Sequence, residues 1–182
     1  KIQCGGTISN CYANVEVTAT DGNAGGIVGG ILVGASEYST DATISNSYFV
    51  GKVSGKGIGG ICGLQTIQTT KDCIVTYTNN YYLNSAATGG VAGVAQAGCT
   101  GLISSQLKTI ATDLGNPFVD NADDSLNNGY PVFEWQIETS DERMSGDANN
   151  DGTIDLKDVV IIRRYVAGGW DVELDTETAD VN

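Results

Sequence analysis

Histidine is absent from the 182 residues, and this absence excludes a large part of enzyme chemistry. Ser-His-Asp and Cys-His catalytic sites, the HExxH zinc helix and most histidine-based zinc sites all require an imidazole. Basic residues are also scarce, with 9 Lys and Arg against 22 Asp and Glu and a formal net charge of -13. This balance argues against binding nucleic acid or an anionic membrane through a positive field, and it is compatible with multivalent cations.

Long apolar runs are missing as well, since no stretch approaches the ~18 consecutive apolar residues of a membrane span. No signal peptide is recognisable in the sequence. Because the chain begins at Lys1 without a methionine, we expect it to be a mature or cut piece of a longer protein.

The five cysteines are an odd number and form no CxxC pair, so neither a zinc site nor a thioredoxin-type site is indicated. They lie at positions 4, 11, 62, 73 and 99. Cys62 aligns with Val28 and Ala92 of neighbouring repeats, a position typical of a small buried side chain. We therefore expect structural, mostly unpaired thiols, with Cys4–Cys11 as the pair to expect if a disulfide exists.

Three segments of the first half repeat one another. They are TISNCYANVEV from Thr7, TISNSYFVGKV from Thr43 and TYTNNYYLNSA from Thr76. Asparagines 10, 46 and 79 coincide in this alignment, as do tyrosines 12, 48 and 81. Each segment is followed by paired glycines, in GGIVGG, GGICG and GGVAG.

The repeats are rich in Val, Ile, Thr and Tyr with apolar residues at alternate positions, which predicts strands. A unit of about 30 residues cannot bury its apolar face alone, so the units must stack. We expect an asparagine ladder and a tyrosine row between units, and glycines where backbones bend or approach closely. The predicted fold class is mainly β: a β-solenoid of stacked glycine-rich repeats over residues 1–98.

These repeats resemble the GLUG motif, which occurs in arrays on bacterial surface and secreted proteins. The resemblance covers roughly residues 5–98, with the third copy the weakest. It implies a surface or adhesive role. The peptidases that carry this motif keep their zinc-binding HExxH elsewhere, and this chain has none.

Residues 99–140 lack the glycine-rich repeat pattern and predict a small α/β cap at the end of the solenoid. The segment 104–115 reads as one helix with Ser104 or Ser105 as N-cap, one apolar face, and Gly115 as its stop. An Asn128-Gly129 turn then precedes an apolar strand with Phe133 and Trp135.

After a polar linker at 141–146, the segment 147–182 opens with an acidic loop, DANNDGTIDLKD. Oxygen donors stand at positions 1, 3, 5, 7, 9 and 12 of this loop: Asp147, Asn149, Asp151, Thr153, Asp155 and Asp158. Gly152 occupies position 6, where an EF-type loop needs a sharp bend, and position 7 supplies a backbone carbonyl. Hard oxygen ligands without nitrogen or sulfur predict a Ca²⁺ site. Position 12 is Asp158 instead of the usual Glu, and no amphipathic helix precedes the loop.

An exiting helix is predicted at 156–167, stopped by the Gly168-Gly169 pair. Its apolar stripe is Leu156, Val159, Ile162 and Val166. This loop-helix resembles a type I-like dockerin, a module that implies calcium-dependent binding to a cohesin module of a scaffold protein in a secreted, cellulosome-like or cell-surface complex. The resemblance implies cohesin contacts at Leu156, Lys157, Arg163 and Arg164; a solvated helix face is the alternative for the two arginines.

Dockerins carry two such loops, and here only the beginning of a second one is present. Asp180 and Asn182 match its positions 1 and 3. We therefore expect a C-terminally truncated dockerin, with calcium binding by this chain and cohesin binding only by the intact parent.

Two functions remain open for the chain. The first is a non-catalytic surface or adhesion module, with a possible glycan or cell-surface ligand, tethered through its dockerin. The second is the C-terminal part of a larger secreted carbohydrate-active enzyme or protease. A sugar-binding row would need outward-facing aromatic rings, whereas we favour these side chains as core residues: Tyr12, Tyr48, Phe49, Tyr81 and Tyr82.

Three weaker patterns have ordinary explanations. Glycines 55, 57 and 60 spell GxGxxG but recur with the repeat and precede no helix. Aspartates 120, 123 and 124 read as a solvated turn, not as a pair of catalytic carboxylates. Glu16 and Lys52 stand at near-equivalent repeat positions and predict an exposed ion pair.

Overall fold

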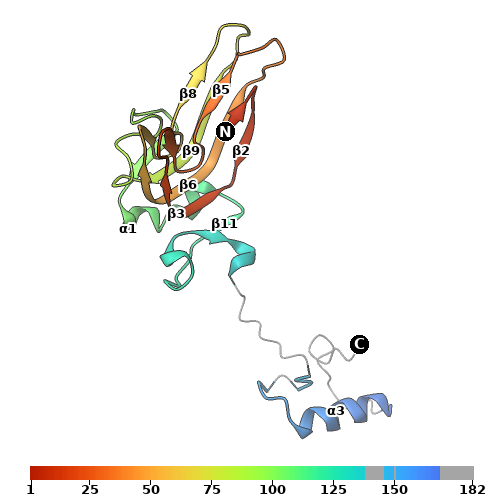
Figure 1. Ribbon diagram of the computed structural model, residues 1–182. Coiled ribbons are helices and arrows are strands. Elements are labelled where there is room, and N and C mark those ends of the chain that lie inside the picture. Colours follow the sequence, from red (N-terminus) through yellow and green to blue (C-terminus); the bar gives the residue numbers. More distant parts are fainter. Residues whose placement is uncertain (138–145, 150, 169–182) are drawn as a thin grey trace. The chain divides into compact units, whose positions relative to one another are not determined.

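The computed structural model describes residues 1–137, 146–149 and 151–168. The chain divides into two compact units, Lys1–Ile137 and Glu138–Asn182, which are described separately. The described part of the first unit is mainly β, and that of the second contains a loop and one helix (Figure 1).

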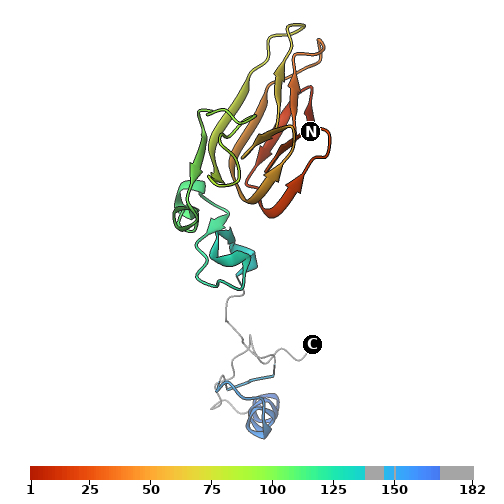
Figure 2. The ribbon, with the colours of Figure 1, turned by 60° about the vertical axis from the view of Figure 1, so that its left-hand side comes forward.

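Most strands of the first unit pair in parallel with the equivalent strand of the next repeat (Figure 2). One sheet has the order β1 (Ile2–Gln3), β5 (Ile31–Val33), β8 (Gln65–Ile67). A five-stranded sheet contains β2 (Gly6–Ser9), β3 (Tyr12–Thr18), β6 (Ala42–Ser54), β9 (Val75–Leu83) and β10 (Cys99–Leu102), with β2 and β3 both pairing β6. A third pairs β4 (Asn23–Gly25) with β7 (Gly57–Gly59).

The strand register reproduces the repeat alignment read from the sequence. Tyr12 lies opposite Tyr48, and Tyr48 lies opposite Tyr81. Because a shift of one residue would exchange the two faces of each strand, this register fixes which side chains share a face. The predicted alignment of the three segments is confirmed.

The repeated asparagines adopt the same unusual backbone conformation. Asn10, Asn46 and Asn79 have φ values of 52°, 47° and 51°, in the left-handed region that asparagine tolerates better than most residues. Asn79 Nδ2 donates to Asn46 Oδ1 at 3.4 Å. This contact confirms the predicted ladder between the second and third repeats.

The paired glycines lie where successive repeats approach most closely. A Cβ on Gly26 would come within 2.2 Å of Phe49 Cγ and 2.3 Å of the Gly60 carbonyl oxygen. On Gly60 it would lie 2.2 Å from the ring of Tyr82. The glycine signature is therefore a packing requirement of the stacked repeats, as predicted.

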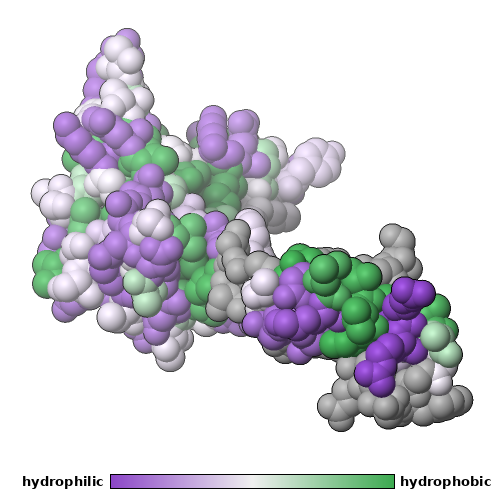
Figure 3. Space-filling view, turned by 90° about the horizontal axis from the view of Figure 1, so that it is seen from below, coloured by the Kyte–Doolittle hydropathy of each residue, from purple (hydrophilic) through white to green (hydrophobic). Residues whose placement is uncertain are grey.

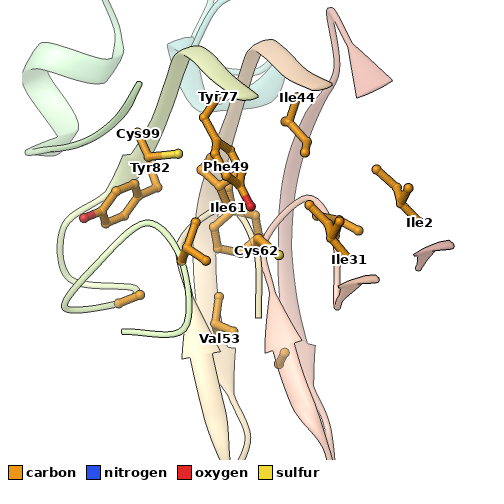
Figure 4. Close-up of a cluster of buried hydrophobic side chains, with 14 of the residues drawn as sticks. Ile2, Ile31, Ile44, Phe49, Val53, Ile61, Cys62, Tyr77, Tyr82 and Cys99 are labelled. Carbon is orange, nitrogen blue, oxygen red and sulfur yellow. The ribbon is translucent and has the colours of Figure 1, made fainter. Parts of the chain in front are cut away.

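The inner core of the first unit lies among the three parallel sheets (Figure 4). Phe49, Ile61 and Tyr82 are buried there beside the thiols of Cys62 and Cys99. All five cysteines are free. Cys4 and Cys11 make no disulfide, and the Cys11 thiol instead donates to the Ser9 carbonyl at 3.2 Å.

A second core forms on the opposite face of the five-stranded sheet. Strand alternation directs Phe49 into the inner core and its neighbours Tyr48 and Val50 to the other face. Tyr12 stacks on Tyr48 with ring centroids 5.3 Å apart and planes 6° from parallel. The prediction that the repeat aromatics are core residues is confirmed for Tyr48, Phe49 and Tyr82, while Tyr12 and Tyr81 are partly buried at this face.

Residues from the segment after β10 cover this second face. The apolar face predicted for the segment is buried against the tyrosine row through Leu107, Ile110 and Leu114. The segment therefore lies across a face of the sheet, whereas the sequence suggested a cap over the end of the stack. The tyrosines explain this difference, because they create a second apolar face that must be covered.

Two details of this segment differ from prediction. The expected single helix is two separate turns, α1 (Ser104–Leu107) and α2 (Ala111–Leu114), and Ile103 precedes α1 as its cap residue. Neither Ser104 nor Ser105 is the N-cap, because both lie inside α1. The Ser104 hydroxyl is instead hydrogen-bonded to the Tyr130 hydroxyl at 2.7 Å. Gly115, with φ 74°, ends α2 as predicted.

The predicted strand with Phe133 and Trp135 is shorter than expected. β12 (Val132–Phe133) pairs antiparallel with β11 (Phe118–Val119), after a 3-10 turn η1 (Asn127–Gly129). A second 3-10 turn, η2 (Glu134–Gln136), places Trp135 outside the strand with 78% of its surface exposed. Gln136 explains the turn, since its Oε1 accepts the Phe133 N–H and its amide contacts the Tyr12 hydroxyl.

In the second unit, α3 (Leu156–Val166) closely matches the predicted helix. Asp155 is its N-cap. Gly168, whose φ is 83°, follows the C-cap residue Ala167. Within the described ranges, no helix combines the length and apolar character needed to cross a membrane.

Candidate metal-binding loop

The acidic loop leads directly into α3 and shares its capping residues. The Asp155 side chain accepts the Lys157 N–H at 2.6 Å, and Asp158 Oδ2 accepts the Asp155 N–H at 2.7 Å. Two candidate ligands, at positions 9 and 12, therefore also form the capping box of the helix. Gly152 has φ 82°, a conformation that side chains rarely adopt, and it makes the bend expected at position 6.

The carboxylates at positions 1 and 12 are buried and anchored by the backbone. Asp147 is 2% exposed and Asp158 is 1% exposed. Asp147 accepts the N–H groups of Asp151 at 3.1 Å and Gly152 at 2.7 Å, one on each oxygen. Asp158 accepts the N–H of Asn149 at 3.4 Å on the oxygen not used by Asp155. The side chains at the first and last positions of the loop are thus hydrogen-bonded to the backbone of its central residues.

The remaining polar side chains continue the same pattern around the loop. Asn149 Oδ1 accepts the Asp151 N–H at 2.9 Å, and Asp151 Oδ1 accepts the Thr153 N–H at 3.0 Å. Lys157 Nζ lies 3.4 Å from Oδ2 of both Asp151 and Asp155. Hydrogen bonds to Asp155 and then Asp151 raise the pKa of the Lys157 ammonium. The pKa of Asp151 is lowered, first by the Asn149 side chain and then by Lys157.

The six predicted ligands are therefore brought into one short loop, but their carboxylates face loop N–H groups. Over the part of the chain that the structure describes, no three acidic, histidine or cysteine side chains converge as a metal cluster. The donor set nevertheless fits a hard divalent cation, since it consists only of oxygens arranged about a glycine bend. Carboxylates fixed by backbone N–H groups keep further lone pairs for a ligand.

The four residues predicted to contact a partner all lie at the surface of α3. Leu156 is 80% exposed, and Lys157, Arg163 and Arg164 are exposed as well. Val159 and Val166 of the predicted apolar stripe are likewise exposed, whereas Ile162 is half-buried. Apolar surface on this unit is visible in Figure 3.

Sequence reasoning missed one role in this site. It assigned Lys157 to partner contact only, whereas the structure places its ammonium on two candidate ligands. The sequence contained a signal for this contact, because Lys157 is a basic residue only six positions after Asp151 and two after Asp155, in the first turn of the predicted helix. The second-loop residues Asp180 and Asn182 lie outside the described residues.

The weaker patterns in the first unit keep their ordinary explanations. Lys52 Nζ lies 3.7 Å from Glu16 Oε1 on the surface, as predicted. Asp124 pairs with Lys108 at 2.7 Å, and Asp123 accepts the Ser125 N–H at 2.8 Å within a turn. The pKa of Asp123 is lowered by its hydrogen bonds from Ser125. This arrangement belongs to an exposed turn.

Comparison with known families identifies the C-terminal segment. Residues 145–182 match the family model of the dockerin type I domain. No curated protein and no solved structure matches the chain. The loop and α3 lie within the matched residues, and the family model therefore places a dockerin type I domain at the C-terminal end of this sequence.

Proposed function

We propose that the C-terminal unit is a calcium-dependent tether that attaches the chain to a cohesin module of an extracellular scaffold protein. The dockerin type I match over residues 145–182 carries this proposal. Two observations support it: the loop has oxygen donors at all six ligand positions, and its helix exposes apolar and basic residues. Cohesin binding is inferred from the family, whose domains bind cohesins on scaffold proteins.

The proposed ligands of the calcium ion are the side chains of Asp147, Asn149, Asp151, Asp155 and Asp158, and the carbonyl of Thr153. The backbone hydrogen bonds of the loop orient these groups. Calcium supplies the positive charge that keeps several carboxylates together. Since Asp155 and Asp158 also cap α3, calcium binding by these residues stabilises the start of the helix.

Calorimetric titration with calcium chloride tests the site. The intact chain is expected to bind calcium, and Asp147→Ala is expected to weaken binding by at least about 10-fold, because it removes a buried anchor of the loop. Asp124→Ala is the matched control, since this exposed carboxylate belongs to the first unit. Absence of chelator-sensitive binding, or equal affinity in the two variants, would contradict the proposed site.

A binding assay with a purified type I cohesin tests the tether. Binding is expected to require calcium and to weaken when charge is reversed in Arg163→Glu. We infer from the family's two-loop organisation that this binding requires a complete second loop, so the assay uses the parent protein that carries both loops. Cohesin binding that persists unchanged in excess chelator would refute calcium dependence.

We propose that the first unit is a β-solenoid of GLUG-like repeats that serves as a non-catalytic surface or adhesion module. Its support is the parallel, in-register pairing of successive repeats in three sheets. Several of its charged residues form exposed pairs, Glu16–Lys52 and Asp21–Lys56 among them. Binding to arrayed glycans or to cell surfaces is the expected result, whereas polysaccharide cleavage or proteolysis by a catalytic domain upstream of Lys1 in the parent protein would favour the enzyme alternative.

A further inference from the structure

Two carboxylates of the acidic loop divide their oxygens between the backbone and one lysine. Asp151 Oδ1 accepts the Thr153 N–H at 3.0 Å, and Asp155 Oδ1 accepts the Lys157 N–H at 2.6 Å. The other oxygen of each carboxylate, Oδ2, lies 3.4 Å from Lys157 Nζ. Asp151 Oδ2 also accepts the side-chain amide of Asn149 at 3.0 Å. The oxygens that the loop's N–H groups leave unused thus converge on a single ammonium.

The loop holds the other two aspartates differently. Asp147 and Asp158 are buried, and each uses both of its oxygens to accept loop N–H groups. Lys157 is in contrast 69% exposed and reaches the loop only at positions 5 and 9. The loop therefore combines a buried pair of anchoring carboxylates with a second pair whose charge is neutralised by an exposed lysine.

We propose that Lys157 is an internal counter-cation of this loop, which must leave Asp151 and Asp155 before their Oδ2 atoms can ligate a divalent cation. This inference rests on the proposed calcium site. Carboxylate ligands lie about 2.3–2.6 Å from calcium, so an ammonium on the same oxygens is within a few ångströms of the metal. Like charges at that separation repel, and Lys157 therefore lowers the affinity of the loop for calcium.

The size of this effect follows from the exposure of Lys157. Exposed ion pairs are individually weak, because water and salt screen them. Removing the Lys157 ammonium, and with it both ion pairs, is therefore expected to change the calcium affinity of the loop by about 3- to 10-fold.

Displacement of Lys157 also has a consequence for the surface of α3. The residue lies in the first turn of the helix, beside the exposed Leu156. With calcium bound, its ammonium is released from the loop and becomes available to a carboxylate on a partner. Calcium loading thereby changes the charge that the beginning of α3 presents.

Calorimetry with calcium chloride on the full chain tests the proposal in three variants. Lys157→Gln is expected to bind calcium about 3- to 10-fold more tightly than the unchanged chain. Arg163→Gln removes the same charge from the same helix and is expected to change affinity by less than about 2-fold, because this residue lies nearly two turns further along. Lys157→Arg keeps the charge and is expected to bind calcium with nearly the affinity of the unchanged chain.

The outcomes separate this inference from the calcium site itself. If the unchanged chain binds calcium and Lys157→Gln binds no more tightly than Arg163→Gln, the counter-cation role is wrong and the site stands. If neither the unchanged chain nor Lys157→Gln binds calcium, both proposals fall.

Lysine labelling provides a second readout that does not depend on affinity. Acetylation followed by mass spectrometry is expected to show faster modification of Lys157 with calcium than with chelator. Lys52 is the internal control, since it is similarly exposed and paired with Glu16 in the first unit. Equal calcium responses of Lys157 and Lys52 would overturn the proposed displacement.

Discussion

Gly60→Ala tests the close stacking of repeats in the first unit. The added methyl group would lie 2.2 Å from two ring carbons of Tyr82 and 2.7 Å from its Cβ, whereas favourable carbon contacts are about 3.5–4.0 Å. Tyr82 is 6% exposed and belongs to β9, which is paired on both sides, so the ring and its strand have little room to retreat. Overpacking a core costs about 1–3 kcal/mol, and this site should lie near the upper value.

Thermal unfolding of the full chain, followed by circular dichroism or calorimetry, measures this effect. For a unit the size of Lys1–Ile137, a loss of about 3 kcal/mol lowers the unfolding temperature by roughly 10 °C. Gly22→Ala is the matched control, because its Cβ would meet nothing within 4 Å, and it should change stability by less than about 1 kcal/mol. Equal unfolding temperatures for the two variants would refute the packing role of the repeat glycines.

Two further predictions concern buried polar groups of the first unit. Tyr48→Phe should lower the free energy of unfolding by about 1–3 kcal/mol in urea titration, since the hydroxyl donates to the Pro131 carbonyl and accepts from Asn127 Nδ2; an unchanged midpoint would contradict this. Stability should also fall as pH rises above 9, because burial raises the pKa of Cys99 from 9.0 to about 12. The raised folded-state pKa means that this contribution is complete below pH 9 and is lost progressively between pH 9 and 12. Cys99→Ala should make that decline shallower, and an identical pH profile would count against the assignment.

Local signals predicted the repeat register and the helix of the second unit well. The alternation of apolar residues and the recurring asparagine and tyrosine positions gave the correct pairing of β3, β6 and β9. The apolar stripe and the glycine stop gave the ends of α3 to within one residue. Helix capping is predictable because it depends on neighbouring residues. Strand pairing is predictable because a repeated sequence places equivalent residues of successive units opposite one another.

Features that depend on contacts distant in sequence were not predicted. The break between α1 and α2 follows from packing on the tyrosine row, and the Ser104 hydroxyl is hydrogen-bonded to the Tyr130 hydroxyl, 26 residues away. The end of β12 similarly depends on Gln136 reaching Tyr12, 124 residues earlier. A pattern confined to ten or fifteen residues does not contain such partners.

For the candidate site, the sequence alone determined which oxygen donors the loop offers, their spacing, the glycine bend and the helix that follows. These features are local, because a twelve-residue loop closes on itself through neighbouring N–H groups. Only the tertiary structure decided that Asp147 and Asp158 are buried anchors while Lys157 lies on Asp151 and Asp155. It likewise decided that Tyr48 and Phe49, adjacent in sequence, belong to two different cores. Burial and side-chain direction depend on what packs against each face, which residue identity and spacing do not specify.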